Sequence, residues 1–196
     1  MPGDNRQVWL VRHGATEWSQ NGRHTGRSDI PLEDLGRRQA DGLRTRLAHH
    51  HFELVLTSPL RRAQETATLA GFGEAQPDPD LMEWDYGEYD GLTSAQIRER
   101  DPAWSLWRAG APGGEAPGEV GRRADRVVAR LREATGDSLV FSHGHFLRVL
   151  AARWLGLDTS AGRYFYLGTA GVGVLGYEQD KPVVRAWNLS ADGGPA

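Results

Sequence analysis

The chain has 196 residues, of which 39% are hydrophobic and 25% charged, and this composition is typical of one globular domain with a substantial core. A net charge of -3 gives no broad basic field, so neither a nucleic acid nor an anionic membrane surface is expected as a partner. The absence of cysteine excludes disulfides, thiolate metal ligands and a cysteine nucleophile. Because the chain opens on polar residues and contains no run long enough to span a membrane, we expect a cytoplasmic protein.

The first predicted strand is a short apolar run that stops at polar residues. Val8 to Gly14 reads VWLVRHG, so Arg12 and His13 follow the apolar part directly. In an open α/β sheet, ligands bind at the carboxyl ends of the strands, which makes this pair a candidate site. An Arg-His pair alone is more often part of a salt-bridged loop, and its meaning depends on the rest of the chain.

Residues 15–33 are rich in Gly, Ser, Asn and Asp and are predicted to form a loop that folds over the end of the first strand. Ser19, Thr25 and the backbone around Gly26 are candidate hydrogen-bond donors to an anion. Ordinary surface loops contain the same residue types, so for each of them a plain loop role is about as well supported.

A helix is predicted from Leu35 to about His49, because apolar residues recur there at near-helical spacing. The histidines at 49–51 resemble a metal site at first sight. Adjacent residues on a helix point in different directions, and histidines at a helix C-terminus favour the dipole, so we expect a solvated helix end.

Leu54 to Leu56 is the second predicted strand, and a helix start follows it at once. Ser58 is the expected N-cap, with Pro59 at the first helical position. Arg61 and Arg62 then lie in the first turn, where a cation opposes the helix dipole unless an anion is bound. This misplacement hints at an anion site, although a solvent-exposed role remains the commoner explanation for Arg61.

A loop at residues 71–80 leads to LMEWDYGEYDGL at residues 81–92, which contains Glu83. Its neighbours in the sequence are largely apolar. An apolar environment disfavours the ionised form of a buried carboxyl, and a carboxyl that keeps its proton can act as a general acid.

A small cap is predicted from about residue 84 to residue 118. Thr93 is expected to cap a helix that runs through Arg100, and a Gly- and Pro-rich stretch ends the segment at residues 111–119. Trp104 and Trp107 either pack in a small core or form a pocket wall, and the sequence leaves both readings open.

The last third of the chain repeats the order of strand, polar tip and helix. A helix is predicted around residues 120–131, and the strand Ser138 to Ser142 ends in His143-Gly144-His145. A further helix follows and stops at Gly156. Residues 163–178 and 182–187 then predict a pair of antiparallel strands at the edge of the sheet.

Four stretches, LVRHGATEW with GRHTGRSDIPLEDLGRRQA, TSPLRRAQETA, LMEWDYGEYDGL and FSHGHFLR, resemble in order the motif regions of the histidine phosphatase superfamily, in its phosphoglycerate-mutase-like branch. The resemblance covers about residues 8–148. It implies a three-layer α/β/α sandwich with a mainly parallel sheet. It also implies that His13 is the phosphorylated nucleophile, that Glu83 is the proton donor, and that Arg12, Arg62 and His143 form the phosphate pocket, with substrate contacts from Ser19, Thr25, Gly26 and Gly144.

Two positions depart from the pattern of many members. Ser19 stands where an asparagine often contacts the phosphoryl group, and Ala116 replaces a serine that would cap the next helix. The motifs resemble most closely the sedoheptulose-bisphosphatase-like members and the bacterial acid phosphatases.

Phosphoryl transfer needs positive charge around three equatorial oxygens, with attack and departure in line. Two arginines and a protonated His143 can supply that charge. His13 must be neutral, with one ring N–H held by an acceptor such as a backbone carbonyl. No Walker loop, HExxH pair or dense aspartate cluster occurs, so no cofactor or metal is expected, and the expected partner is a small-molecule phosphate ester. Whether the chain forms a homodimer stays open.

The sequence therefore predicts a metal-independent phosphomonoesterase that acts on a small metabolite, most simply a sugar phosphate. A mutase is the nearest alternative, because it uses the same pocket while excluding water. Only 60 positions separate Glu83 from His143, a shorter span than the resemblance implies for mutases, which disfavours that alternative. A non-catalytic phospho-ligand binding module is the third reading, and turnover of p-nitrophenyl phosphate would exclude it.

Overall fold

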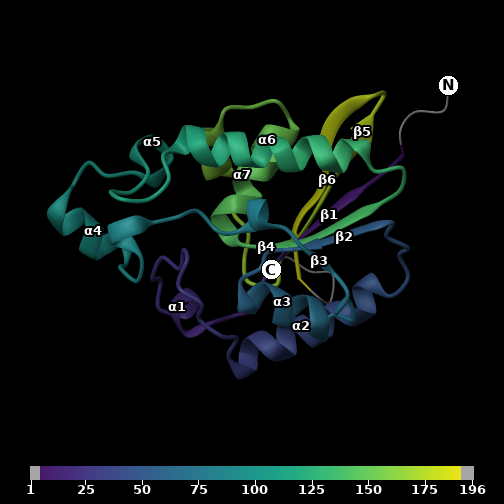
Figure 1. Ribbon diagram of the computed structural model, residues 1–196, viewed down its shortest axis with the longest axis horizontal. Coiled ribbons are helices and arrows are strands. Elements are labelled where there is room, and N and C mark those ends of the chain that lie inside the picture. Colours follow the sequence, from purple (N-terminus) through teal and green to yellow (C-terminus); the bar gives the residue numbers. More distant parts are fainter. Residues whose placement is uncertain (1–4, 191–196) are drawn as a thin grey trace.

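The computed structural model describes residues 5–190, which form a central sheet with helices on both faces (Figure 1). The strands are β1 (Val8–Arg12), β2 (Leu54–Thr57), β3 (Gln76–Pro77), β4 (Ser138–Ser142), β5 (Val172–Glu178) and β6 (Lys181–Leu189). Their order in the sheet is β3-β2-β4-β1-β5-β6.

The first four strands of that order run parallel, and β5 and β6 are antiparallel to their neighbours. The mainly parallel sheet and its antiparallel pair confirm the expected fold class. In the register, Arg12 pairs with Ser142 and Thr57 with Phe141, so β1, β2 and β4 end at nearly the same level. The polar residues that follow these strands are therefore brought to one edge of the sheet.

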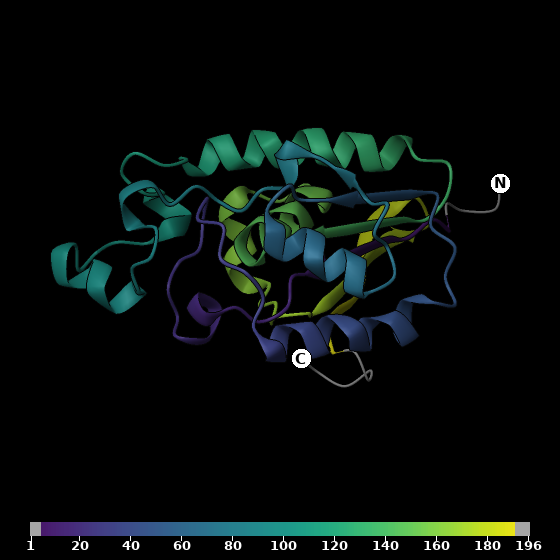
Figure 2. The same ribbon diagram turned by 60° about the horizontal axis from the view of Figure 1, so that its bottom comes forward.

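The α-helices are α1 (Glu17–Gln20), α2 (Asp34–Leu47), α3 (Arg61–Leu69), α4 (Ser94–Arg100), α5 (Leu106–Ala109), α6 (Pro117–Glu133) and α7 (Gly144–Trp154). Short 3-10 helices occupy Pro79–Leu81, Gly87–Tyr89 and Thr159–Tyr164. In Figures 1 and 2, α6 and α7 cover one face of the sheet and α2 and α3 the other, while α4 and α5 project beyond its end.

Both faces of the sheet are buried because successive side chains of a strand point to opposite sides. Val8 and Leu10 belong to the core under α6 and α7, whereas Trp9 and Val11 belong to the core under α2. Because both faces of β1 are buried, apolar residues are needed at every position from Val8 to Val11, and this part of the β1 sequence is a continuous apolar run. No helix within residues 5–190 is long and apolar enough to cross a membrane.

Several local predictions were wrong in the first third of the chain. The predicted loop at residues 15–33 contains α1, whose N-terminus is closed by reciprocal hydrogen bonds between Thr16 and Ser19. Leu35, counted among the recurring apolar residues of this helix, lies in the first turn of α2 and is 40% exposed. The helix α3 begins at Arg61 rather than at Pro59, and its N-cap is Leu60.

The later elements follow the predictions more closely. Thr93 caps α4 as expected, and β4 has the predicted bounds. The predicted strand at 163–178 begins only at Val172, because a 3-10 helix and a loop occupy the residues before it. The short β3 lies inside the predicted loop at 71–80. The histidines at 49–51 are exposed just beyond α2, as predicted.

Candidate active site

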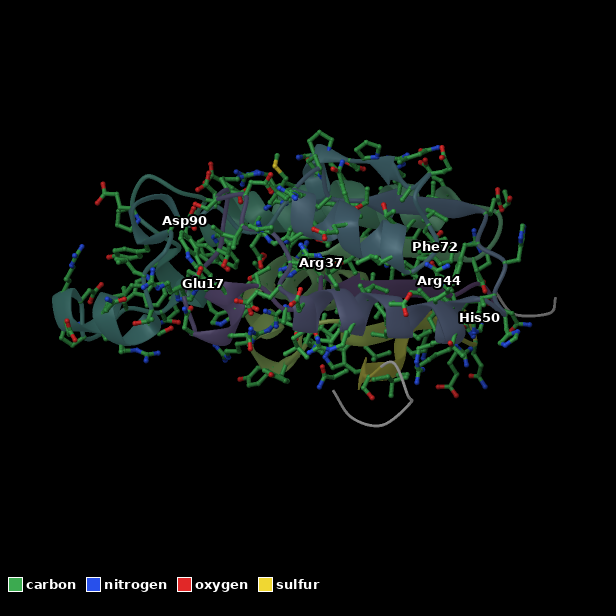
Figure 3. The ribbon with its side chains drawn as sticks, turned by 90° about the horizontal axis from the view of Figure 1, so that it is seen from below. Glu17, Arg37, Arg44, His50, Phe72 and Asp90 are labelled. Atoms are coloured by element: carbon green, nitrogen blue, oxygen red, sulfur yellow. The ribbon has the colours of Figure 1, made fainter. Side chains whose placement is uncertain are left out.

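A pocket opens at the edge of the sheet where β1 and β4 end. Arg12, His13, Glu83 and Gly144 line it, and we call these residues, together with Arg62 and His143 beside them, the floor. We call a second group of lining residues the rim: Arg23, His24, Tyr86, His145, Arg148 and Tyr166. Ser19, Thr25 and Leu167 complete the lining. Figure 3 shows that Glu17 and Asp90 lie at the end of the molecule that carries α4, whereas His50 and Phe72 lie at the opposite end.

His13 is buried immediately after β1, and its ring is fixed by the backbone. Nδ1 lies 2.7 Å from the carbonyl oxygen of Gly14, so Nδ1 carries the proton and donates it. Burial lowers the pKa of His13 well below its ordinary value, and Arg62 and Arg12 lower it further. The ring is therefore neutral, with an unprotonated Nε2 that accepts no hydrogen bond from a described residue. This is the tautomer that nucleophilic attack requires.

Arg12 extends from the end of β1 along the floor. One terminal nitrogen donates to the carbonyl of Leu167 at 2.7 Å, whereas the buried Nε has no partner among the described residues. A Cβ on Gly144 would lie 3.2 Å from the guanidinium carbon of Arg12, so glycine is the residue that fits without displacing this group. A buried donor without a partner is costly, and an anion in the pocket would satisfy it.

Arg62 is fully buried behind the pocket rather than lining it. Its terminal nitrogens donate to the carbonyl oxygens of Ser28, Thr25 and Gly26 at 2.8 to 3.1 Å, and Nε donates to His143. Four of the five guanidinium N–H groups are thus engaged, and the fifth is not used by these contacts. The predicted phosphate contact by Arg62 is limited to that donor in this conformation.

His143 accepts and donates through its two ring nitrogens at once. Nδ1 lies 3.2 Å from Arg62 Nε, and Nε2 lies 2.7 Å from the hydroxyl of Ser58. Burial lowers the pKa of His143 well below its ordinary value, and the charge of Arg62 adds to this effect. His143 is therefore neutral in the ligand-free protein, and a protonated His143 during phosphoryl transfer stays a prediction.

Glu83 is buried, but polar donors surround its carboxylate. Oε1 accepts the backbone N–H groups of Trp84 and Phe146 at 2.8 Å, and Oε2 accepts that of His145 at 3.0 Å. Two of these three N–H groups belong to the first turn of α7, so the start of this helix holds the carboxylate in place. Glu83 and its apolar neighbours Trp84 and Tyr86 are all buried, and the donors from the distant helix are the feature that the sequence did not predict.

A family model for the Histidine phosphatase superfamily (branch 1) matches residues 8–190. The chain is 43% identical to an acid phosphatase of Mycobacterium tuberculosis, covering 89% of this chain and 88% of that protein. It is 34% identical to the sedoheptulose 1,7-bisphosphatase of Saccharomyces cerevisiae, covering 80% and 70%. A solved structure of an open reading frame from M. tuberculosis superposes with a TM-score of 0.92 at 40% identity, covering 95% and 99%.

The chain belongs to the histidine phosphatase superfamily. The family resemblance found in the sequence is confirmed, and so is the prediction that the chain is a phosphatase. The roles of individual residues do not follow from these similarities and depend on the geometry of the site.

Three predicted substrate contacts of this histidine phosphatase have other partners. The Ser19 hydroxyl donates to the carbonyl of Thr16 and closes α1, although Ser19 also lines the pocket. Thr25 lines the pocket and its carbonyl holds Arg62. The N–H of Gly26, expected to face an anion, instead donates to Asp90 at 2.8 Å, so that backbone donor is not available to a substrate.

Sequence reasoning missed the aromatic and imidazole groups of the rim. The hydroxyl of Tyr86 lies 2.6 Å from His145 Nδ1, and the ring of His24 lies 4.8 Å from that of Tyr86. Arg148 lies 4.7 Å above the ring of Trp107. The second histidine of the HGH triplet and the tyrosine three residues after Glu83 were visible signals, because both stand beside predicted site residues.

The two cap tryptophans have different environments. Trp104 is buried in the core, and its indole N–H donates to the carbonyl of Gly110 at 2.9 Å. Trp107 supports Arg148 from behind without lining the pocket. Neither indole lines the pocket, but Trp107 packs against two residues of the rim, Arg148 and His145. Within residues 5–190, no three His, Asp or Glu side chains are grouped so that they could hold a metal ion.

Proposed function

We propose that this protein hydrolyses a small phosphorylated metabolite of the sugar phosphate class, without a metal ion, through a phosphohistidine at His13. The observation that carries the proposal is the Nδ1–H bond from His13 to the Gly14 carbonyl. It leaves the Nε2 lone pair free in a pocket that also holds Arg12 and Glu83. A nucleophile, a cation and a proton-transfer group are the parts that phosphoryl transfer requires.

The proposed reaction has two steps. His13 Nε2 attacks phosphorus, the phosphorus–oxygen bond to the alcohol breaks, and Glu83 gives its proton to the leaving oxygen. The first step therefore requires Glu83 in its protonated form. Water then attacks the phosphohistidine, Glu83 takes a proton from that water, and orthophosphate leaves.

Positive charge for the transferring group comes from arginine in this proposal. Arg12 offers its unpartnered Nε, and Arg62 offers its one remaining N–H. Guanidinium groups keep their charge and form paired hydrogen bonds to phosphate oxygens. We expect EDTA to leave the rate unchanged, and an activity that EDTA removes and Mg²⁺ or Zn²⁺ restores would contradict this part of the proposal.

Two observations favour a sugar phosphate as the substrate. The rim offers imidazole, phenol and guanidinium groups, which suit the hydroxyl groups and charge of such a molecule. The similarity to a sedoheptulose 1,7-bisphosphatase supports the same class. A mutase remains the alternative, because it would use the same floor.

One experiment tests the intermediate and separates the two activities. The protein is incubated with ³²P-labelled ester and quenched without acid, and we expect a base-stable, acid-labile label that the His13→Ala variant lacks. The exposed His51→Ala variant is the matched control and should keep the label.

In a parallel reaction, 3-phosphoglycerate with a trace of the 2,3-bisphosphate should yield orthophosphate. Rapid formation of 2-phosphoglycerate without orthophosphate would instead establish a mutase. A label that persists in His13→Ala would contradict the phosphohistidine mechanism.

A further inference from the structure

Ser58 contacts the ring of His143 and has no role in the mechanism described above. Both side chains are fully buried, and the Ser58 hydroxyl lies 2.7 Å from His143 Nε2. The same oxygen accepts the backbone N–H of Leu60 at 3.3 Å. The hydroxyl expected to cap a helix therefore faces a histidine of the floor instead.

The contacts of His143 decide which of its nitrogens carries the proton. Arg62 Nε can only donate, so Nδ1 of His143 must be the unprotonated nitrogen that accepts it. A neutral imidazole has one N–H, which then lies on Nε2 and donates to Ser58. Arg62, His13, Arg12 and Arg123 are the charged or titratable groups whose fields act on His143, and none of them is a carboxylate that would favour a second proton.

We propose that Ser58 is a positioning residue that holds His143 as the Nε2–H tautomer and, through it, fixes the guanidinium of Arg62. The bonds form a chain in which His143 donates to Ser58 and Arg62 donates to His143. The other engaged donors of Arg62 are held by backbone carbonyls, so its Nε is the one held by a side chain. The chain thereby directs the one N–H of Arg62 that remains for a phosphate oxygen, and its effect on catalysis rests on the proposed function.

Removal of the Ser58 hydroxyl leaves His143 with no satisfactory neutral form. If the proton stays on Nε2, it is buried without an acceptor. If the proton moves to Nδ1, two donors face each other, because Arg62 Nε also points there. Either the ring or the guanidinium must move, and the donor available to the phosphate moves with it.

The first test reads the tautomer directly and needs no turnover. Long-range ¹H–¹⁵N spectra of the histidine-labelled protein distinguish protonated from unprotonated ring nitrogens, and the His143 signals are those absent from a His143→Gln variant. We expect a protonated Nε2 and an unprotonated Nδ1 in the unaltered protein. A proton on Nδ1 would overturn the proposal, whatever reaction the protein catalyses.

The second test compares Ser58→Ala with Ser142→Ala. Ser142 is equally buried, and its hydroxyl donates to the carbonyl of Leu81, so the control removes the same atoms beside the same histidine. We expect Ser58→Ala to change the His143 tautomer signals and to lower kcat roughly ten- to a hundredfold, with a smaller change in KM. Ser142→Ala should keep the tautomer signals and kcat of the unaltered protein. An unchanged spectrum and kcat in Ser58→Ala would overturn the proposal, and so would equal losses in the two variants.

Discussion

The floor and the rim of the pocket are held in place by different kinds of contact. In the floor, the main chain fixes three of the side chains: His13 through a carbonyl, Glu83 through three backbone N–H groups and Arg62 through three carbonyls. In the rim, contacts between side chains join those with the main chain, since Arg148 also donates to the carbonyls of Gly162 and Arg163. Tyr86 bonds to His145, and Arg148 rests on Trp107.

This difference indicates which residues determine the chemistry and which determine substrate binding. The floor depends on where the strands end and where α7 begins, so the fold itself positions the chemistry. The rim depends on side chains that come from several segments of the chain, and of these only Tyr86 belongs to the predicted cap. These side chains can change without moving the backbone of the floor. We therefore expect changes in the floor to reduce kcat and changes in the rim to alter substrate affinity and local stability.

The largest effect is expected from Glu83→Gln. A missing general acid typically costs about 10² to 10⁴ in rate, so kcat for an alkyl phosphate should fall by roughly that factor. The loss should shrink for p-nitrophenyl phosphate, whose leaving group needs little protonation. Steady-state kinetics with the two esters measure the difference.

Asp90→Asn is the matched control for Glu83→Gln. The Asp90 carboxylate also accepts backbone N–H groups, those of Gly26 and Ser28, but it does not line the pocket. This variant should lose stability without a dependence on the leaving group. Equal losses for both esters in Glu83→Gln would assign that residue to structure alone.

A second effect concerns the stability of the rim at acid pH. Burial lowers the pKa of His24 to about 4. The unfolded chain therefore takes up a proton on this residue near pH 6.5, whereas the folded protein does so only near pH 4. Its contribution to the free energy of unfolding is complete above pH 6.5 and is lost as the pH falls toward 4.

Urea unfolding at several pH values between 7.5 and 4 measures this contribution. Between about pH 6.5 and 4, one proton makes the free energy of unfolding change by about 1.4 kcal/mol per pH unit, and His24→Gln should remove this slope. His51→Gln, at an exposed position, should keep the slope of the unaltered protein. If the free energy of unfolding of His24→Gln kept the same slope against pH, the folded protein would not lower the pKa of His24.

The sequence predicted the elements of the floor because their signals are local. The apolar run of β1 and the strand before His143 are continuous in the chain, so the polar residue after each strand could be located. Their meeting at one edge followed from the parallel sheet. The register of Arg12 with Ser142 then places the residues that follow, His13 and His143, at the same level.

The backbone carbonyl that holds His13 was expected from the chemistry and belongs to the next residue, Gly14. The other contacts could not be predicted where their partners are distant in the sequence. The N-terminus of α3 receives Asp29, whose carboxylate accepts the N–H of Arg61 at 2.8 Å, so Ser58 is not needed as its cap. Glu83 receives two of its three donors from α7, more than sixty residues away. The neutral state of His143 likewise depends on the charge and burial that tertiary packing brings to it.

The smallest effect is expected from Tyr86→Phe, which removes one hydroxyl from the rim and keeps the ring. Its bond to His145 Nδ1 is then lost, and an imidazole of the rim is left free to reorient. One neutral hydrogen bond is worth about 0.5 to 1.5 kcal/mol, so KM for a sugar phosphate should rise roughly two- to tenfold while kcat changes little.

Tyr164→Phe provides the control for this variant, because that tyrosine is 72% exposed and does not line the pocket. It should leave both constants unchanged. Because Tyr86 lies only three residues after Glu83, its variant is the most demanding test of the boundary between floor and rim. If Tyr86→Phe lowered kcat a hundredfold at constant KM, the phenol would take part in the chemistry, and the division would have to be redrawn with Tyr86 in the floor.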